Sequence, residues 1–444
     1  MRQEAQAIVL AAGPGMRMTS LTSHTPKCLL PLGTLPMLCY PLHLLQQAGF
    51  SEVSVVVSEG QEQRVGKMVE QYGLKVDLDV AVVSTAHDPG TADSLRQIAS
   101  KIKQRSVEEV VVISSDLVTD VALQDVLDQH RSRGADLTML TSPTPSLQTT
   151  PPGPKSKTHL NSDIICTEAG SGRLVYAVAG GDYDECVTLQ SSLLNCAAPL
   201  LLSASTQDAH LYVMKRWLFD YVLNKESPCA DMGSLKAEIL PHIVSCQFTD
   251  HSSNDKLGLS GAVEREEWDD LVKKYNSSVV PSRHHSLAHL QPPVCLTFHH
   301  PGLCVRANTL HTYWHLNRKI NELFNQVYPN SEWQLRHPTA VIIERAQVSE
   351  DSVVGGGTMV CEKTNIASSV VGKHCRINPL VRLSSSVLGD HVTLASGCVI
   401  ENSLILASVE RKCVIKNCIV TDSNKIEEGK TYSGEVLEAT QDFA

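Results

Sequence analysis

The sequence predicts an α/β domain with a mainly parallel sheet, followed by a β-solenoid built from short repeats. Over the first 140 or so residues, aliphatic runs alternate with helix-like stretches, which is typical of domains with parallel sheets. Between residues 341 and 430 a short motif returns at a constant interval, which indicates stacked repeat units. The 444 residues include 42% hydrophobic and 19% charged side chains, so the chain can bury the cores of two or three domains.

The strands of the first domain are predicted from continuous aliphatic runs, at residues 7–12, 53–58, 76–84 and 110–115. Helical stretches lie between and after them, at 36–48, 91–103 and 234–244, and 209–223 carries both strand and helix signals. Residues 142–160 are rich in Pro, Ser and Thr and predict a flexible excursion from the fold. We therefore place the first domain at residues 1–250, and a linker and connecting segment at 251–340.

A repeated Ser-aliphatic-aliphatic motif defines the second domain. It begins at Ser352, Ser369, Ser386 and Ser403, which are evenly spaced, and a related unit follows at Cys418 after a slightly shorter step. Between copies, aliphatic residues recur about every six positions, so three short strands complete one coil around an aliphatic interior. Glycines are expected at the corners of the coils. The alternative, a run of β-hairpins, would show Asn-Gly or Asp-Gly turns, which are scarce here. The solenoid is placed at 341–430 and a C-terminal tail at 431–444.

The stretch from Leu10 to Leu32 carries the most specific functional signal. An apolar strand runs into Gly13 and Gly15, Arg17 follows, and Lys27 comes after a short loop. Glycines let backbone N–H groups approach an anion, and the two cationic side chains neutralise its charge, so this layout predicts phosphate binding. The alternative is structural: the glycines make a strand-to-helix turn, and Arg17 and Lys27 are solvated or paired within the protein.

Together these strings resemble the nucleotidyltransferase family, which makes nucleotide sugars from sugar phosphates and nucleoside triphosphates. The resemblance extends to Gly90-Thr91-Ala92, similar to a motif near the nucleotide base, and to Asp116, where the family holds a metal-binding aspartate. It implies that the solenoid is a left-handed β-helix of hexapeptide repeats. It also implies vestigial nucleotide-binding positions at Gly13, Gly15, Arg17, Lys27, Gly90 and Thr91. Asp116 would be a vestigial metal position, with the capping of a helix as its structural alternative.

Several departures from the family pattern argue against an active enzyme. Met16 replaces the threonine of Gly-Thr-Arg, Cys28 replaces the second proline of Pro-Lys-Pro, and Ser115 replaces the glycine before the metal aspartate. The Glu-Lys-Pro that binds sugar and phosphate is absent, and the corresponding stretch is 173–181. We therefore expect a degenerate transferase fold with no catalytic residues and no cofactor.

Four further strings narrow the resemblance to the gamma-subunit family of eukaryotic translation initiation factor 2B; they run from Asp88 to Arg96, Ser114 to Leu123, Asp208 to Tyr212 and Cys295 to Arg306. The chain also ends soon after the solenoid, where the epsilon subunits carry an exchange domain. The resemblance implies a non-catalytic subunit that pairs with epsilon, assembles with alpha, beta and delta, and promotes GDP/GTP exchange on initiation factor 2. An active sugar-1-phosphate nucleotidyltransferase is the alternative, and a nucleotide-sensing module is a weaker one.

Composition excludes some other classes of function. The net charge of −10 argues against a sequence-blind nucleic-acid binder. The 14 cysteines are scattered without a Cys-x-x-Cys pair, and the Cys295–Cys304 cluster with His299 and His300 matches no usual zinc spacing. Because no signal peptide or 18-residue apolar run is present, we expect reduced, mostly buried thiols in a cytosolic protein with no membrane partner.

Overall fold

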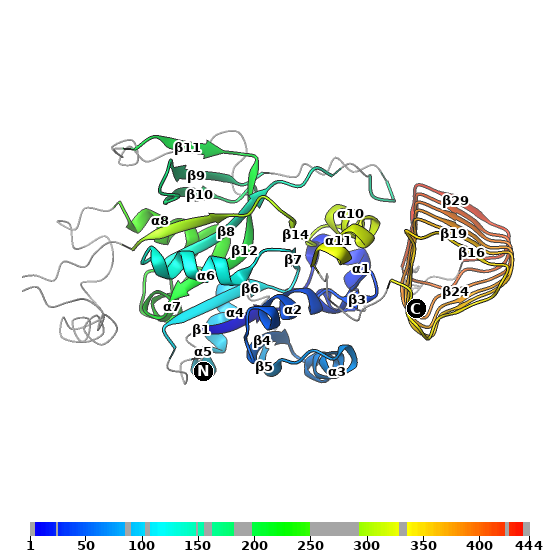
Figure 1. Cartoon of the computed structure of the whole chain (residues 1–444), viewed down its shortest axis with the longest axis horizontal. Coiled ribbons are helices and arrows are strands. Elements are labelled where there is room, and N and C mark those ends of the chain that lie inside the picture. The colour runs from blue at the N-terminus through cyan, green and yellow to red at the C-terminus, as the bar shows by residue number, and fades with distance from the viewer. Residues whose placement is uncertain are drawn as a thin grey trace, which may run out of the picture.

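The computed structural model describes residues 5–23, 25–84, 90–102, 107–147, 150–154, 162–181, 198–248, 293–327, 335–421 and 426–437. Of the predicted linker and connecting segment at 251–340, residues 251–292 and 328–334 lie outside these residues. Within them, no helix combines the length and the apolar character needed to cross a membrane. An α/β domain and a solenoid of stacked short strands are the two parts of the fold (Figure 1).

A seven-stranded sheet in the order β13-β8-β12-β6-β1-β4-β5 forms the centre of the α/β domain. Only β12 runs antiparallel to its neighbours in this sheet; the other adjacent pairs are parallel. The sheet is therefore mainly parallel, as predicted. The strands are β1 (Ala5–Leu10), β4 (Glu52–Ser58), β5 (Asp77–Val83), β6 (Glu109–Ser114), β8 (Leu137–Pro143), β12 (Thr206–Lys215) and β13 (Cys295–His299).

Helices cover both faces of this sheet, so its strands are apolar on both sides. In β1, Ala7 and Val9 face one core cluster and Ile8 faces the other. The first cluster includes α2 (Cys39–Gln47), α3 (Glu62–Tyr72) and α6 (Leu123–Ser132). The second includes α4 (Thr91–Gln97), α7 (Arg216–Leu223), the π-helical turn η4 (Leu235–Ile239) and α8 (Leu240–Cys246). Within the single helix predicted at 91–103, the described residues 91–102 form α4 and a separate short helix, α5 (Ala99–Ile102).

Small sheets and turns complete the domain. Strands β9 (Ile164–Glu168), β10 (Leu174–Val178) and β11 (Leu200–Ser203) form a separate antiparallel sheet. After β1 the chain makes the short helices η1 (Met16–Met18), α1 (Thr19–Thr22) and η2 (Lys27–Leu29), and then the two-residue strands β2 (Pro31–Leu32) and β3 (Leu35–Pro36).

Part of the segment expected to be a linker belongs to the α/β domain. Strand β13 pairs in parallel with β8, and β14 (Cys304–Arg306) pairs antiparallel with β7 (Leu117–Thr119). The helices α10 (Leu310–Arg318) and α11 (Ile320–Val327) follow, and Trp314 of α10 is fully buried in the core. Little in the sequence indicates this, because strands as short as β13 and β14 carry no clear periodic pattern.

The solenoid consists of three parallel sheets whose strands stack coil on coil (Figure 1). Val353 pairs with Val370, Val370 with Val387, Val387 with Leu404, and Leu404 with Ile419. The three equal predicted steps and the shorter fourth step therefore correspond to the strand register between successive coils. The first sheet contains β15 (Val341–Ile342), β18 (Met359–Val360), β21 (Arg376–Ile377) and β24 (Thr393–Leu394). The second contains β16 (Gln347–Val348), β19 (Asn365–Ala367), β22 (Arg382–Ser384), β25 (Val399–Glu401), β27 (Val414–Lys416) and β29 (Thr431–Ser433). The third contains β17 (Val353–Val354), β20 (Val370–Val371), β23 (Val387–Leu388), β26 (Leu404–Ile405), β28 (Ile419–Val420) and β30 (Val436–Leu437).

The short step and the end of the solenoid have clear structural forms. In the coil after Ile405, the single residue Val409 takes the place of a full strand and pairs with Leu394 on one side and Ile426 on the other. One of the three sides of this coil is therefore shorter. Strands β29 and β30 add further pairing beyond residue 430. Described residues 431–437, expected to lie in a tail, therefore continue the solenoid.

The serine that opens each repeat unit is a buried hydrogen-bonding group. Ser369 donates its N–H to Ser352 Oγ (3.3 Å), Ser386 N–H to Ser369 Oγ (3.1 Å) and Ser403 N–H to Ser386 Oγ (3.1 Å). The hydroxyls thus accept hydrogen bonds from buried backbone N–H groups of the next coil, at one corner of the solenoid. This ladder explains why the repeat begins with a small hydroxyl side chain.

The glycines of the solenoid have the expected role only in part. Turns use glycines with positive φ, namely Gly357, Gly397, Gly429 and Gly434, but other corners use non-glycine residues with positive φ, among them Lys363 (56°) and Leu380 (64°). Gly355 and Gly372 instead lie where coils stack: a Cβ on Gly355 would stand 2.6 Å from the carbonyl oxygen of Gly372. The repeat therefore needs glycine for close approach of backbones and only in part for bending.

One of the apolar core clusters spans both domains. The outward column Val353, Val370, Val387, Leu404 and Ile419 is almost fully buried, and these residues join the core cluster that contains α2, α10 and α11. Arg318 also donates to the carbonyl oxygen of Ser368 (3.0 Å). Near the far end of the column, Gly153 donates its N–H to Asn417 O (2.7 Å) and lies against Ile419. The described end of the Pro-rich excursion therefore contacts the solenoid.

Candidate nucleotide site

The loop after β1 contains the two predicted glycines and places Gly15 next to Lys27. Gly15 has a φ of 76°, and a Cβ there would lie 2.7 Å from Thr22 Cγ2 and 3.3 Å from Lys27 Cβ. Gly15 is thus required for the turn into η1, which brings α1 against the Lys27 segment. Gly13 has open space around it. Arg17 is exposed, and its neighbour Met16 is 70% exposed.

Lys27 and Asp116 meet in an ion pair that also includes Arg306. Asp116 follows β6 and is only 1% exposed, and Lys27 Nζ donates to its Oδ2. Arg306, the last residue of β14, donates from Nε to Asp116 Oδ1 (3.0 Å) and from Nη2 to Oδ2 (3.1 Å). Ser114 Oγ donates to Oδ1 at 2.7 Å. The bidentate arginine makes this a strong charge-assisted arrangement.

The electrostatics keep Asp116 ionised. Burial alone would raise the pKa of this carboxyl, but Arg306 and Lys27 hold the pKa of Asp116 well below its ordinary value. Burial lowers the pKa of Lys27, and Asp116 opposes that shift. The group therefore contains one carboxylate shared by two cations, and both cations come from this chain.

The residues at Asp116 do not fit the magnesium ion that the resemblance implies. A carboxylate has about four lone-pair positions, and Asp116 accepts four hydrogen bonds, two on each oxygen. A divalent ion needs several oxygen ligands at about 2.1 Å. Among the described residues, no cluster of three or more His, Cys, Asp or Glu side chains is arranged to hold a metal.

Gly90 and Thr91 lie apart from the Lys27 group and are locked against another loop. A Cβ on Gly90 would overlap the carbonyl oxygen of Gly233, and Ala92 donates its N–H to that same oxygen (2.9 Å). Thr91 Oγ1 accepts the N–H of Leu235 (2.8 Å). Arg96 reinforces the contact by donating to the carbonyl oxygen of Met232 (2.8 Å). The observed contacts of both residues are therefore structural.

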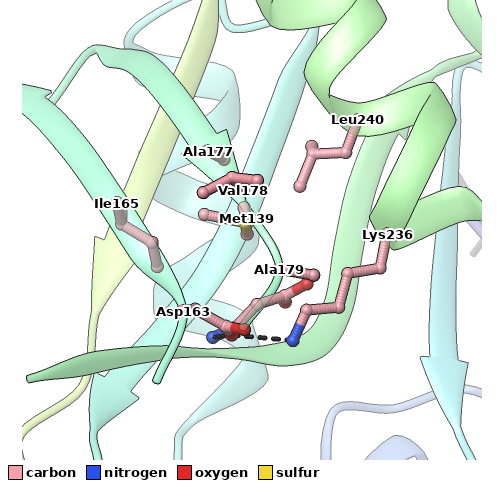
Figure 2. Close-up of a pocket in the computed structure, with 9 residues that line it drawn as sticks. Met139, Asp163, Ile165, Ala177, Val178, Ala179, Lys236 and Leu240 are labelled. Atoms are coloured by element: carbon pink, nitrogen blue, oxygen red, sulfur yellow. Dashed lines mark hydrogen bonds and ion pairs between the residues drawn. The ribbon is translucent and has the colours of Figure 1, made fainter. Parts of the chain in front are cut away.

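A second polar group was not predicted from the sequence. Asp163 Oδ2 accepts from Lys236 Nζ (2.7 Å) and from the N–H of Asp208 (2.9 Å). Tyr212 OH donates to Asp208 Oδ2, and burial raises the pKa of Asp208. Figure 2 shows the Asp163–Lys236 pair at the edge of a cavity lined by apolar side chains of β8, β9, β10 and α8.

This cavity lies at the stretch that corresponds to the missing Glu-Lys-Pro. Residues 173–181 form β10 and its end, so Ala177, Val178 and Ala179 line the cavity (Figure 2). His210, beside this region, has a φ of 56° where β12 shifts register. Burial lowers the pKa of His210 well below its ordinary value, so it stays neutral.

Sequence reasoning missed Arg306, Asp163 and Lys236 as site residues. Arg306 had a signal: it is a lone charge after the apolar pair Cys304-Val305 in a short strand. Asp163 and Lys236 had none, because their pairing joins segments 73 residues apart.

Comparison with known proteins finds a transferase-type family model in the first domain and relatives that are similar over most of the chain. A family model described as nucleotidyl transferase matches residues 6–152. A translation initiation factor eIF2B subunit gamma from Dictyostelium discoideum is 26% identical over 396 residues, covering 84% of this chain and 88% of that protein. One from Schizosaccharomyces pombe is 28% identical over 441 residues, covering 98% of this chain and 90% of that protein. The predicted resemblance to eIF2B gamma subunits is confirmed.

Similarity to the transferases themselves is shorter. A mannose-1-phosphate guanylyltransferase from Mycobacterium tuberculosis is 29% identical over 136 residues, covering 31% of this chain and 36% of that enzyme. The Dictyostelium and Schizosaccharomyces gamma subunits, in contrast, match across both the α/β domain and the solenoid. A nucleotidyltransferase-type domain followed by a solenoid is therefore the predicted fold class, and it is the observed one.

Proposed function

We propose that this chain is a non-catalytic structural and regulatory subunit of the eIF2B complex. In this role it pairs with an epsilon-type subunit, assembles with alpha, beta and delta subunits, and promotes GDP/GTP exchange on initiation factor 2 at the start of protein synthesis, in the cytosol. The observation that carries the proposal is similarity to gamma subunits along 84–98% of the chain, through the solenoid as well as the transferase-type domain.

The state of the site supports the non-catalytic part of the proposal. Nucleotidyl transfer with a magnesium ion needs a carboxylate that is free to bind it. Asp116 is instead saturated by Lys27, Arg306 and Ser114. The stretch where the family carries Glu-Lys-Pro has alanine and valine side chains at the cavity.

Affinity purification of the tagged full-length chain from its own cells tests the assembly. We expect the four other exchange-factor subunits, with epsilon the most tightly retained, and we expect co-expression with epsilon to improve the solubility of the chain. A monomeric, stable chain that recovers none of these subunits would contradict the proposal.

An active sugar-1-phosphate nucleotidyltransferase is the second candidate, favoured by the family match over residues 6–152. It is tested by incubating the purified chain with sugar 1-phosphate, nucleoside triphosphate and magnesium. Turnover on the order of 1 per second would establish the enzyme and refute the non-catalytic assignment. A chain without turnover that still recovers its subunits supports the first candidate.

A further inference from the structure

The site at Asp116 is built from three segments that are far apart in the chain. Lys27 comes from the loop after β1, Asp116 from the end of β6, and Arg306 from β14, 190 residues after Asp116. We call residues 304–318 the neck. They comprise β14 and α10 and lead from the α/β domain to α11 and then to the solenoid. One carboxylate thus ties the first loop of the domain to the neck.

Backbone pairing places Arg306 at Asp116 with little freedom. Arg306 pairs with Leu117, the residue after Asp116, and the N–H of Ala307 donates to the carbonyl oxygen of Asp116 (2.8 Å). Further along the neck, Asn317 Oδ1 accepts the N–H of Gly33 (2.9 Å), and Tyr313 OH donates to the carbonyl oxygen of Pro31 (2.5 Å). The neck therefore contacts the β6–β7 segment at one end and the β1-to-α2 region at the other.

The charges at this point leave no role for a further cation. Asp116 carries one negative charge, while Lys27 and Arg306 carry two positive charges, with exposed fractions of 14% and 16%. A divalent ion at this carboxylate would meet two adjacent cations and no second described carboxylate ligand. It could reach Asp116 only after the Arg306 side chain had given up both of its hydrogen bonds to the carboxylate.

We propose that Arg306 is the resident cation of this site, and that docking of the neck and binding of a divalent metal at Asp116 exclude each other. Arg306 is a positioning residue: it fixes the neck, and so the approach to the solenoid, through the carboxylate that an active transferase would use for its metal. This inference goes beyond the proposed function, because it concerns the chain alone and does not depend on the complex.

Binding of Mn²⁺ to the full chain, followed by electron paramagnetic resonance, tests the exclusion. We expect no Asp116-dependent site with a Kd tighter than about 1 mM in the wild type. In Arg306→Met we expect one gained weak site, at least about tenfold tighter than any wild-type binding, in which water completes the shell around Asp116. Asp116→Asn in the Arg306→Met background should remove it. Arg131→Met is the matched control, since Arg131 pairs with Glu109 (2.8 Å) away from the site, and should bind no Mn²⁺. Asp116-dependent binding in the wild type, or no gain in a folded Arg306→Met, would overturn the proposal.

Hydrogen exchange keeps the inference testable if Arg306→Met does not fold. In Asp116→Asn the two cations lose their charged partner, so the neck amides should exchange about tenfold faster or more, while the amides of β4 keep their protection. Unchanged protection of the neck would refute the positioning role. Neither measurement involves other subunits, so a negative result leaves the assembly test intact.

Discussion

Replacing the stacked glycines of the solenoid with alanine tests whether backbone contact sets the repeat. In Gly372→Ala the new Cβ would stand 2.5 Å from the carbonyl oxygen of Gly389 and 2.6 Å from its carbonyl carbon. Atoms of a stacked backbone cannot yield separately, so the coils must move apart. We expect a loss of about 1–3 kcal/mol in the free energy of unfolding, as for other overpacked cores. Gly355→Ala meets the backbone of Gly372 in the same way, at 2.6 Å, and should cost a similar amount.

Two further glycines give this series its controls. In Gly389→Ala the nearest atom is Leu406 Cδ2, at 2.8 Å, the end of a flexible side chain, so the cost should be smaller. Gly66 lies within α3 with nothing inside 4 Å, so Gly66→Ala should stabilise the protein by about 0.5–1 kcal/mol through helix propensity. Urea denaturation midpoints at constant slope provide the comparison. The reasoning is wrong if Gly372→Ala is neutral, or if Gly389→Ala is as costly as Gly372→Ala.

Three other predictions follow from buried groups. Burial lowers the pKa of His130 from 6.5 to about 4, so the folded state disfavours protonation of this side chain. The free energy of unfolding should therefore fall as the pH drops from about 6.5 to 4. In thermal melts measured over a pH series, His130→Leu should flatten that part of the curve. Leu404→Ala truncates a fully buried side chain between the domains and should cost about 2–5 kcal/mol in urea denaturation, whereas the exposed Leu201→Ala should change little. Ser386→Ala removes the acceptor for the buried N–H of Ser403 and should cost about 1–3 kcal/mol, with faster exchange of that amide; an unchanged exchange rate would contradict the ladder.

The residues around Asp116 and the cavity differ from the family pattern, while the architecture is that of the family. Met16 is exposed on the loop where a threonine was expected, and the family's glutamate and lysine positions lie among alanine and valine. Gly15 makes the turn into η1, and Lys27 and Asp116 pair within the group that also contacts the neck. Gly15, Lys27, Gly90 and Thr91 thus have contacts within the chain, whereas Gly13 and Arg17 are open to solvent.

The sequence by itself determined the repeat of the solenoid, the main strands of the α/β domain and the glycine turn after the first strand. Each of these features depends on residues that are close together in the sequence: an even spacing of serines, an aliphatic run, or a glycine between a strand and a helix. Only the tertiary structure decided what Asp116 binds, because Lys27 lies 89 residues before it and Arg306 lies 190 after it. It also decided that residues 295–306 complete the sheets, since the partners of short strands are chosen by packing and not by local pattern.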